Sequence, residues 1–274
     1  MVQERIFLGI LIGLISYSSL YIGKGIQKHA VDGIKEVKSL KTKHSGVWIA
    51  GTILTALPVF FQWAALLFAP IKLIAPLEGI GLIVLLLFSY RFLREKITPV
   101  EIAGSAAVIA GIFLIALFLK EGTTAAAAEE VATSRLLFIL LPLALAETAL
   151  VLFCLRLRVL ITGYIIGFTA GTAMAFQTLA KRISTVPGFP VYGIIGVIIF
   201  APLTLFITQV GFARGKANQV VPAFTAASIV VATVSGYLIL GERLLPPQFA
   251  GIFLVAAGAI FMTAFRKTGQ TEHT

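Results

Sequence analysis

The stretch "REKITPVEIAGSAAVIAGIFL" spans residues 94–114, and a similar stretch, "GERLLPPQFAGIFLVAAGAIF", spans residues 241–261. Aligned without a gap, both contain a glutamate followed by a basic residue, then a proline, then two glycines seven residues apart. The matched pairs are Glu95 with Glu242, Lys96 with Arg243, Pro99 with Pro246, Gly104 with Gly251 and Gly111 with Gly258. The repetition predicts two copies of one structural unit in the chain.

The composition indicates that the chain lies in a membrane. Of its 274 residues, 58% are hydrophobic and 12% are charged, and the mean hydropathy is +1.00. Apolar runs of roughly 18 to 23 residues recur along the chain, each long enough to cross about 30 Å of hydrocarbon as a helix. The runs are apolar all round, which favours helices over the alternating strands of a barrel. We predict an all-α, polytopic membrane protein with nine transmembrane helices, at about 5–23, 46–68, 72–92, 98–119, 136–156, 159–180, 190–212, 218–240 and 246–265.

The repeat predicts that the two halves are inverted relative to each other. Pro76 precedes Glu95 by 19 residues and Pro222 precedes Glu242 by 20, so the similarity extends upstream of the two phrases. Four spans plus one linker span make an odd number of crossings, which turns the second copy upside down. We expect a first four-helix repeat at 1–120, an outer loop and linker helix at 121–158, and a second, inverted repeat with a cytoplasmic tail at 159–274. This architecture is typical of alternating-access transporters.

The charge distribution predicts the orientation. Most of the 22 Lys and Arg residues fall in the tail and in the loops after the odd-numbered spans, and such loops are usually cytoplasmic. We therefore expect an integral protein of the inner or plasma membrane with its N-terminus outside and its C-terminus in the cytoplasm. The basic stretch "KGIQKHAVDGIKEVKSLKTKHSG", residues 24–46, is predicted to be a loop facing anionic lipid.

The phrase "GERLLPPQFAGIFLVAAGAIFM" resembles the end of the EamA-type repeat of the drug/metabolite transporter superfamily. The stretches "FAPIKLIAPLEGIGLIVLLLFSYRFLREKI" and "ITQVGFARGKANQVVPAFTAASIV", together with nine spans, resemble the NIPA-like magnesium transporter branch. The resemblance covers most of the chain and is strongest over residues 60–115 and 200–262. It implies a helical inverted-repeat transporter for magnesium or a related divalent cation. Glu78 departs from the pattern, which has a small residue after the Pro-Leu pair.

Two acidic residues inside the spans are candidate ligands for the substrate or for a metal ion. An ionisable side chain at mid-bilayer costs roughly 2.5–3.5 kcal/mol on insertion scales, so its presence needs a reason. Glu78 lies in the third span, two residues after Pro76, and Glu147 lies in the fifth span, after Pro142. Each is either a cation ligand or coupling group, or a neutral glutamate that is hydrogen-bonded to a neighbouring helix.

Other polar side chains in the spans either line a substrate path or join helices by hydrogen bonds. These further candidate substrate-binding residues are Gln62, Gln209, Gln177, Asn218, Tyr17 and Ser18. Pro76 and Pro222, at matched places in the repeats, are predicted hinges or helix interruptions. The four glycines of the repeated phrase are predicted to let helices pack closely. Glu95 and Glu242 are explained either by helix capping or by pairing with the neighbouring Lys96 and Arg243.

The function that we predict is transport by alternating access, with magnesium or a related divalent cation as the first choice of substrate. A permease for a small organic solute, with proton coupling through Glu78, and a non-transporting membrane scaffold are the alternatives. An enzyme is not expected, because His29, His44 and His273 lie in a loop or the tail and no HExxH or phosphate-binding loop occurs.

We expect no cofactor and no nucleic-acid partner, since the positive charge follows the predicted topology. The expected partners are the lipid bilayer and the transported ion or small molecule, and a homodimer is a hypothesis for the assembly. The single cysteine, Cys154, allows no intramolecular disulfide and is interpreted as a packing residue.

Overall fold

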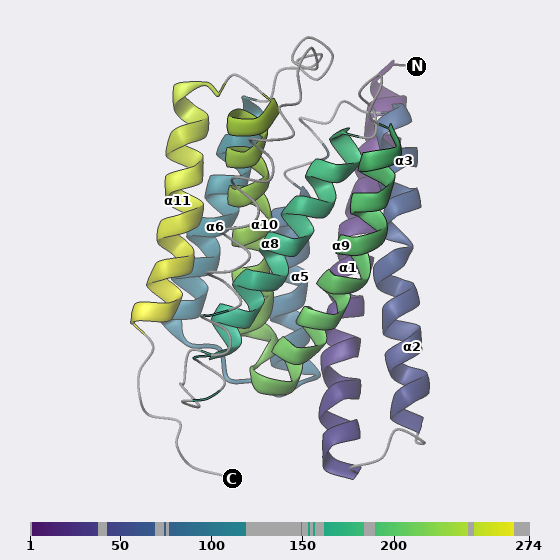
Figure 1. The fold of residues 1–274 in the computed structure, drawn as a ribbon, viewed down its shortest axis with the longest axis vertical. Helices are drawn as coiled ribbons and strands as arrows, with labels where there is room; N and C mark the ends of the chain where they lie inside the picture. The colour runs from purple at the N-terminus through teal and green to yellow at the C-terminus, as the bar shows by residue number, and fades with distance from the viewer. Residues whose placement is uncertain are drawn as a thin grey trace.

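The computed structural model of the protein describes residues 2–37, 43–68, 74, 77–118, 149, 153, 156, 162–183, 190–240 and 244–265. These residues form helices joined by short connections, and no strand occurs among them, which confirms the all-α prediction for this part of the chain. The helices are α1 (Val2–Val37), α2 (Lys43–Ala56), α3 (Pro58–Phe68), α5 (Leu77–Arg91), α6 (Pro99–Leu117), α8 (Thr162–Ile183), α9 (Pro190–Arg214), α10 (Ala217–Leu240) and α11 (Pro246–Ala264) (Figure 1).

Five helices of the described part are long and apolar enough to cross a membrane: Glu4–Glu36, Pro99–Leu117, Val191–Arg214, Ala217–Leu238 and Pro246–Ala264. They correspond to the first, fourth, seventh, eighth and ninth predicted spans. Helix α8 matches the sixth predicted span but is not among the five. Most of its Gly, Ala and Thr side chains are buried, and it packs against α9 and α10, so it has less need of a lipid-facing apolar surface. The linker span predicted at 136–156 falls almost wholly outside the described residues.

Helix α1 is longer than the sequence predicts. The first span was expected to end at residue 23 and a basic loop to begin at Lys24, but the helix continues to Val37. The extra turns are helical because one side of them packs: Gln27 and Lys28 are buried, and Lys28 Nζ lies 2.7 Å from Asp32 Oδ1, an i,i+4 ion pair. The prediction that this stretch is a loop at the lipid surface was therefore wrong up to Val37.

The second predicted span, 46–68, is divided in two. Helix α2 ends at Ala56, Leu57 is a turn, and α3 begins at Pro58. Proline lacks an N–H and crowds the preceding turn, which accounts for the break. The Ser16 hydroxyl of α1 donates to the Pro58 carbonyl at 3.1 Å and so joins α1 to this break.

The sequence predicts hinges or helix interruptions at Pro76 and Pro222, and the structure describes only the second of these residues. Helix α10 runs without a break from Ala217 to Leu240 with Pro222 inside it, so the predicted interruption there was wrong. Pro222 lies near the start of the helix, where its missing N–H leaves only the carbonyl four residues earlier without its usual donor. Pro76 lies outside the described residues.

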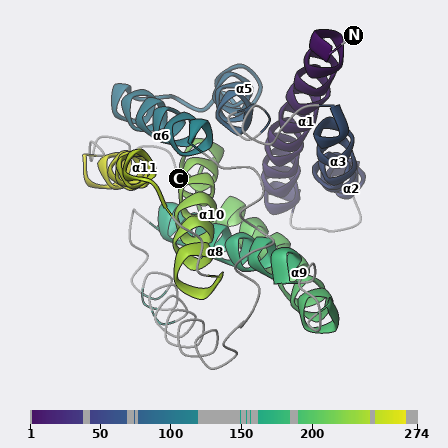
Figure 2. The ribbon, with the colours of Figure 1, turned by 90° about the horizontal axis from the view of Figure 1, so that it is seen from above.

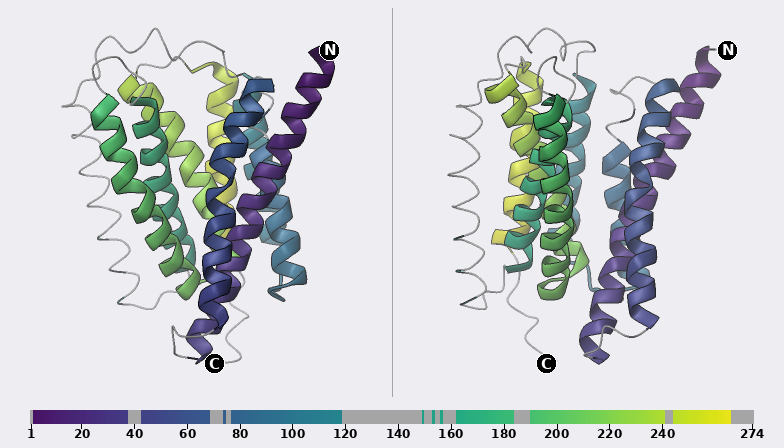
Figure 3. Two further views of the ribbon diagram at one scale, coloured as in Figure 1. Left: turned by 90° about the vertical axis from the view of Figure 1, so that its right-hand side faces the viewer. Right: turned by 45° about the vertical axis from the view of Figure 1, so that its right-hand side comes forward.

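The helices pack as two similar groups and a pair. Helix α1 packs on α2, α3 and α5, while α8 packs on α9 and α10, and α6 packs on α11. All run along the long axis of the molecule (Figure 3). Viewed from the end, α10 lies near the middle, with α6 and α11 on one side and α1, α2 and α3 on the other (Figure 2). Helix α10 accordingly contacts helices from the N-terminal half of the chain, α1, α5 and α6, and helices from the C-terminal half, α8, α9 and α11.

Helices α6 and α11 begin in the same way. Both have a proline in the first turn, and in both the third helical residue accepts a hydrogen bond from the backbone N–H of the residue before the helix. Glu101 Oε2 accepts from Thr98 N–H at 2.8 Å, and Gln248 Oε1 accepts from Leu245 N–H at 2.8 Å. A side chain that returns to the start of its helix satisfies a donor that would otherwise be free.

The glycines of the repeated phrase bring α6 and α11 into backbone contact, as predicted. A Cβ added to Gly111 would lie 2.6 Å from the carbonyl oxygen of Gly251, and one added to Gly258 would lie 2.6 Å from the carbonyl oxygen of Gly104. Neither position has room for a side chain. Small residues on facing helices permit such contact, which matters in lipid because apolar surfaces gain little there from association.

We expect Gly111→Val to lower the free energy of unfolding by about 1–3 kcal/mol, since the added side chain forces the two backbones apart. The matched control is Ala110→Val, because Ala110 is the neighbouring residue of α6 and is exposed. Denaturant titration in detergent measures both variants. Equal stability of the two would contradict the close packing of α6 on α11.

Candidate functional site

Side chains from α1, α5 and α10 meet where the two halves of the bundle adjoin. The hydroxyl of Tyr21, which is fully buried, donates to Glu78 Oε1 at 3.4 Å and lies 2.8 Å from the hydroxyl oxygen of Thr225. Lys24 reaches the same place from the next turn of α1, and its Nζ lies 3.3 Å from the centre of the Phe224 ring. We call these five residues the central cluster.

Glycine positions α1 against α5 beside the central cluster. A Cβ added to Gly81 would lie 3.1 Å from the carbonyl oxygen of Tyr17, and it would also collide with the ring of Tyr21. The absence of a side chain at residue 81 therefore lets the two helices approach. Glu78 is one turn before Gly81 on α5, so this close approach brings its carboxylate to Tyr21.

Lys24 is the most unusual member of the cluster. Its side chain is 5% exposed, and among the described residues its Nζ has no hydrogen-bond partner. The ring of Phe224 lies against it, and the centre of the Tyr21 ring, whose hydroxyl donates to Glu78, is 5.4 Å away. A cation over aromatic rings is stabilised by their negative faces, although this compensates only part of the cost of removing an ammonium group from water.

The oxygen atoms of the cluster suit a hard cation. A carboxylate and two hydroxyl groups are ligands that Mg²⁺ accepts, and this ion commonly keeps several waters and needs only one or two carboxylates. Within the described residues, no group of three or more His, Cys, Asp or Glu side chains could hold a metal ion. The cluster thus offers one carboxylate to a cation that keeps part of its hydration shell.

The structure describes the side chains of three further predicted site residues, Tyr17, Ser18 and Gln177. Tyr17 is buried one turn before Tyr21 on α1, and Ser18 is half-buried beside it. Gln177 is half-buried on α8. Gln62 lies on α3, but its side chain is not among those described, and Glu147 lies outside the described residues.

Gln209 is part of a hydrogen-bond network that joins three helices. Its Nε2 donates to Gln27 Oε1 of α1 at 3.1 Å, and its Oε1 accepts from Trp48 Nε1 of α2 at 2.9 Å. Gln27 in turn donates to the hydroxyls of Thr52 and Thr55, at 3.1 and 3.3 Å. Of the two interpretations that the sequence left open for Gln209, the interhelical hydrogen bond is present.

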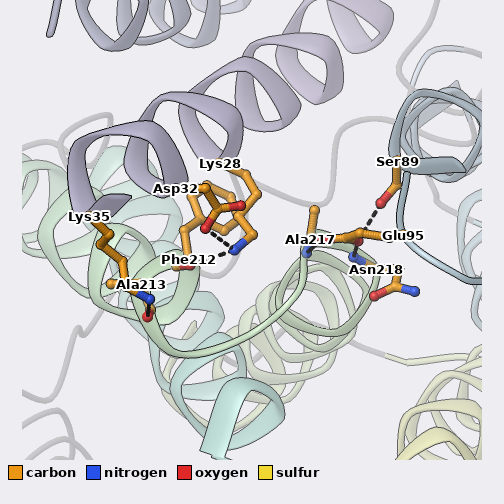
Figure 4. A network of polar contacts seen from close by, with 9 residues as sticks. All are labelled: Lys28, Asp32, Lys35, Ser89, Glu95, Phe212, Ala213, Ala217 and Asn218. Atoms are coloured by element: carbon orange, nitrogen blue, oxygen red, sulfur yellow. Dashed lines mark hydrogen bonds and ion pairs between the residues drawn. The ribbon is translucent and has the colours of Figure 1, made fainter. Parts of the chain in front are cut away.

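Glu95 caps a helix of the other half. Its two carboxylate oxygens accept from the backbone N–H groups of Ala217 at 2.8 Å and Asn218 at 3.1 Å, and the Ser89 hydroxyl also donates to it (Figure 4). A carboxylate at a helix start satisfies free donors and complements the positive end of the helix dipole. Of the two roles expected for Glu95, helix capping is present, and the capped helix is α10.

The turn after α5 aims Glu95 at α10. Arg94 has a φ of 55°, a left-handed conformation that ends the helix, and the Glu95 N–H then donates back to the Ser89 carbonyl at 3.1 Å. Asn218, a predicted substrate ligand, reinforces the same junction, because its Nδ2 donates to Glu101 Oε2 at 3.1 Å. Its Oδ1 is buried without a hydrogen-bond partner among the described residues.

Two lysines of α1 bind the end of α9 close to this junction (Figure 4). Lys28 Nζ donates to the carbonyl of Phe212 at 2.9 Å, and Lys35 Nζ donates to the carbonyl of Ala213 at 2.7 Å. The last carbonyls of a helix have no partner within it and carry partial negative charge, which explains why ammonium groups lie there.

Sequence reasoning missed Tyr21, Lys24, Phe224 and Thr225 as site residues. Lys24 was assigned to a loop because it follows the most apolar part of the first span. The signal that could have found it is spacing: Tyr21, Lys24 and Lys28 lie three and four residues apart, which places them on one face of a continuing helix.

Long apolar helices with charged side chains inside the bundle are typical of helical membrane transport proteins. The family model described as Magnesium transporter NIPA matches residues 3–165. The chain belongs to this family and is a membrane protein of the magnesium-transporter type.

Two relatives of the chain have names that agree with this family. NIPA-like protein 2 of Mus musculus is 30% identical over 124 residues, which cover 45% of this chain and 32% of that protein. Probable magnesium transporter NIPA9 of Arabidopsis thaliana is 28% identical over 265 residues, which cover 86% of this chain and 74% of that protein. The match thus spans about a third of the mouse protein and about three quarters of the plant protein. No solved structure matches the chain.

We expect Gln209→Leu to lower the free energy of unfolding by about 1 kcal/mol, the usual range for an interhelical hydrogen bond in a membrane protein. A double-mutant cycle with Gln27→Leu supplies the control. If the two side chains act through their mutual bond, the double variant is less destabilised than the sum of the single variants. Additive effects would show that the bond does not couple α1 to α9.

Proposed function

We propose that the protein carries Mg²⁺ across its membrane by alternating access, with Glu78 as the charged ligand of the ion. The observation that carries the proposal is the position of this carboxylate, which faces Tyr21 of α1 and lies with Thr225 of α10 where the two halves adjoin. An ionisable residue inside the membrane generally marks an ion or substrate pathway. The family model and the name of the Arabidopsis relative support magnesium as the ion.

Alternating access requires two halves that can exchange roles, and the α6–α11 contact supports an inverted repeat. In the sequence alignment Gly104 corresponds to Gly251 and Gly111 to Gly258. In the structure Gly104 faces Gly258 while Gly111 faces Gly251. Such a crossed exchange of equivalent positions arises when two copies of a unit are related by a two-fold axis that passes between them.

The packing of the remaining helices supports the same arrangement. Gly13 faces Leu77 and Gly25 faces Phe88, so α1 and α5 run parallel; Gly167 faces Val220 and Gly171 faces Phe224, so α8 and α10 also run parallel. Helices α6 and α11 begin at opposite ends of the bundle (Figure 1). We propose the boundaries 1–120 for the first repeat, 121–158 for the linker and 159–274 for the second repeat.

The contacts of Glu95, Lys28 and Lys35 join the two halves at one end of the molecule, where α5, α9 and α1 end (Figures 1 and 4). We propose that they form the closed gate of the transporter. The basic residues near this end favour a cytoplasmic position for it, with the N-terminus outside. With this end closed, we propose that the ion reaches the buried central cluster from the outer side.

Lys24 favours a second candidate substrate, a small zwitterion. An ammonium and a carboxylate held in one cluster beside aromatic rings could bind an organic solute with one charge of each sign. This is the permease function of the wider drug/metabolite transporter superfamily.

Purified protein in liposomes separates the two candidates. We expect uptake of Mg²⁺, measured with a trapped indicator dye, and no uptake of labelled amino acids or amines. Glu78→Gln should reduce Mg²⁺ uptake by about 100-fold or more, since a charged ligand is lost from a buried site. Glu36→Gln, which neutralises an exposed carboxylate at the end of α1, is the matched control and should retain uptake.

Three results would contradict this proposal. Uptake of amino acids without uptake of Mg²⁺ would favour the organic solute, and full Mg²⁺ uptake by Glu78→Gln would remove Glu78 from the site. No flux of any solute by the wild type would support the scaffold instead.

The gate can be tested by accessibility. We expect Glu95→Ala to open the end at which Glu95 caps α10, because the free N–H groups of Ala217 and Asn218 then need water. In a Cys154→Ser background, a cysteine at Thr225 reports on entry: an impermeant thiol reagent added from that side should label it several-fold faster in Glu95→Ala. Lys96→Ala, at the exposed neighbouring residue, should leave labelling slow. Unchanged labelling in Glu95→Ala would contradict the gate.

A further inference from the structure

We propose that Lys24 is a built-in counter-cation, which neutralises Glu78 whenever the transporter carries no Mg²⁺ and must be displaced from Glu78 when Mg²⁺ binds. This inference rests on the proposed function, because it assigns a role to a neighbour of the proposed ion ligand. It concerns whether the unloaded protein can complete a transport cycle.

The position of Lys24 is the first reason. The residue is buried, and no described side chain or carbonyl accepts a hydrogen bond from its ammonium group. Tyr21 links it to Glu78, because Lys24 Nζ lies 5.4 Å from the centre of the Tyr21 ring and the Tyr21 hydroxyl donates to Glu78 Oε1 at 3.4 Å. A lysine that only anchored α1 would be expected to bind a carbonyl or a carboxylate directly, as Lys28 does four residues later. An ammonium near a carboxylate without a fixed partner is instead free to approach it and to withdraw from it.

The repeat gives the second reason. Glu78 is two residues after Pro76, and Phe224 is two residues after Pro222. Lys24 packs on Phe224 while its neighbour Tyr21 binds Glu78, so this part of α1 meets corresponding positions of the two proposed repeats. A counter-cation at this junction can interact with Glu78 whichever way the halves are tilted. The aromatic ring of Phe224, 3.3 Å from Nζ, holds the ammonium beside the cluster without a hydrogen bond, so the ammonium can shift towards the Glu78 carboxylate or remain on the ring.

Charge balance gives the physical consequence. With Lys24 beside it, Glu78 adds no net charge to the unloaded site, and an uncompensated carboxylate inside the protein is strongly disfavoured. Without Lys24, the unloaded carrier would have to close around a bare carboxylate before returning to the other side. Removal of Lys24 should therefore slow the return of the unloaded carrier while the loaded carrier still crosses.

A competing cation also lowers the affinity for the ion that displaces it. Because Mg²⁺ and the Lys24 ammonium compete for one carboxylate, replacing Lys24 by a neutral residue should strengthen Mg²⁺ binding. A residue that merely supported the fold, or one that helped to bind the substrate, would weaken binding when replaced. The sign of the change thus separates the three roles.

Binding is measured first, by titrating purified wild type, Lys24→Gln and Lys24→Arg with Mg²⁺ in a calorimeter. We expect Lys24→Gln to bind Mg²⁺ about tenfold more tightly, whereas Lys24→Arg, which keeps the charge, stays within about threefold of the wild type. Weaker binding by Lys24→Gln would overturn the inference.

Transport is measured next, in liposomes, with isotopically labelled Mg²⁺. Exchange of labelled for unlabelled Mg²⁺ needs only the loaded carrier, while net uptake into Mg²⁺-free liposomes needs the unloaded carrier to return. We expect Lys24→Gln to retain exchange but to lose at least about tenfold in net uptake, and Lys24→Arg to retain both.

The exchange reaction shows whether a variant is folded, so a loss of net uptake alone is informative. Equal exchange and net uptake by Lys24→Gln would overturn the counter-cation role. Loss of both activities by Lys24→Gln would also contradict it, since it would place Lys24 in the binding or folding of the protein. If the wild type shows neither Mg²⁺ binding nor flux, the proposed function itself fails, and this result is distinct from the others.

Discussion

The cost of placing charge inside a structure surrounded by lipid governs the rest of this protein. Lys24 of α1 is buried and Glu78 of α5 is half-buried, and each would be costly alone. Their mutual attraction, the hydroxyls of Tyr21 and Thr225 and the ring of Phe224 lower that cost. A site whose charge is only partly compensated can bind a cation strongly when the cation replaces the compensating group.

The same constraint explains where the two halves are joined. At one end of the bundle, Glu95 satisfies the first N–H groups of α10, and Lys28 and Lys35 satisfy the last carbonyls of α9. Helix ends near a membrane have no neighbouring donors or acceptors in lipid, so charged side chains of the other half are effective partners. Such contacts are also reversible, because water can replace them, and this suits a gate better than apolar packing does.

The sequence predicted the helical class, the positions of the long apolar helices and the close packing of Gly104 and Gly111 on α11, because each depends on local composition and spacing. It misjudged the length of α1 and the effect of Pro222, because burial against α2 and α9 stabilises a polar helical turn and a proline near a helix start is tolerated. It proposed Glu78 as a site residue but missed Lys24 and Tyr21, whose partners lie on helices distant in the sequence. For Gln209 and Asn218, only the arrangement of the helices shows which hydrogen bonds they make.

The central claim is that a divalent cation binds at Glu78, between the two halves. The most direct measurement is an electron cryomicroscopy or crystal structure of the protein in lipid with Mn²⁺ in place of Mg²⁺. The account predicts density for the ion beside the Glu78 carboxylate, within reach of Tyr21 and Thr225, with the Lys24 ammonium moved away from Glu78. Density confined to the surface loops, with Lys24 Nζ hydrogen-bonded to Glu78, would contradict it.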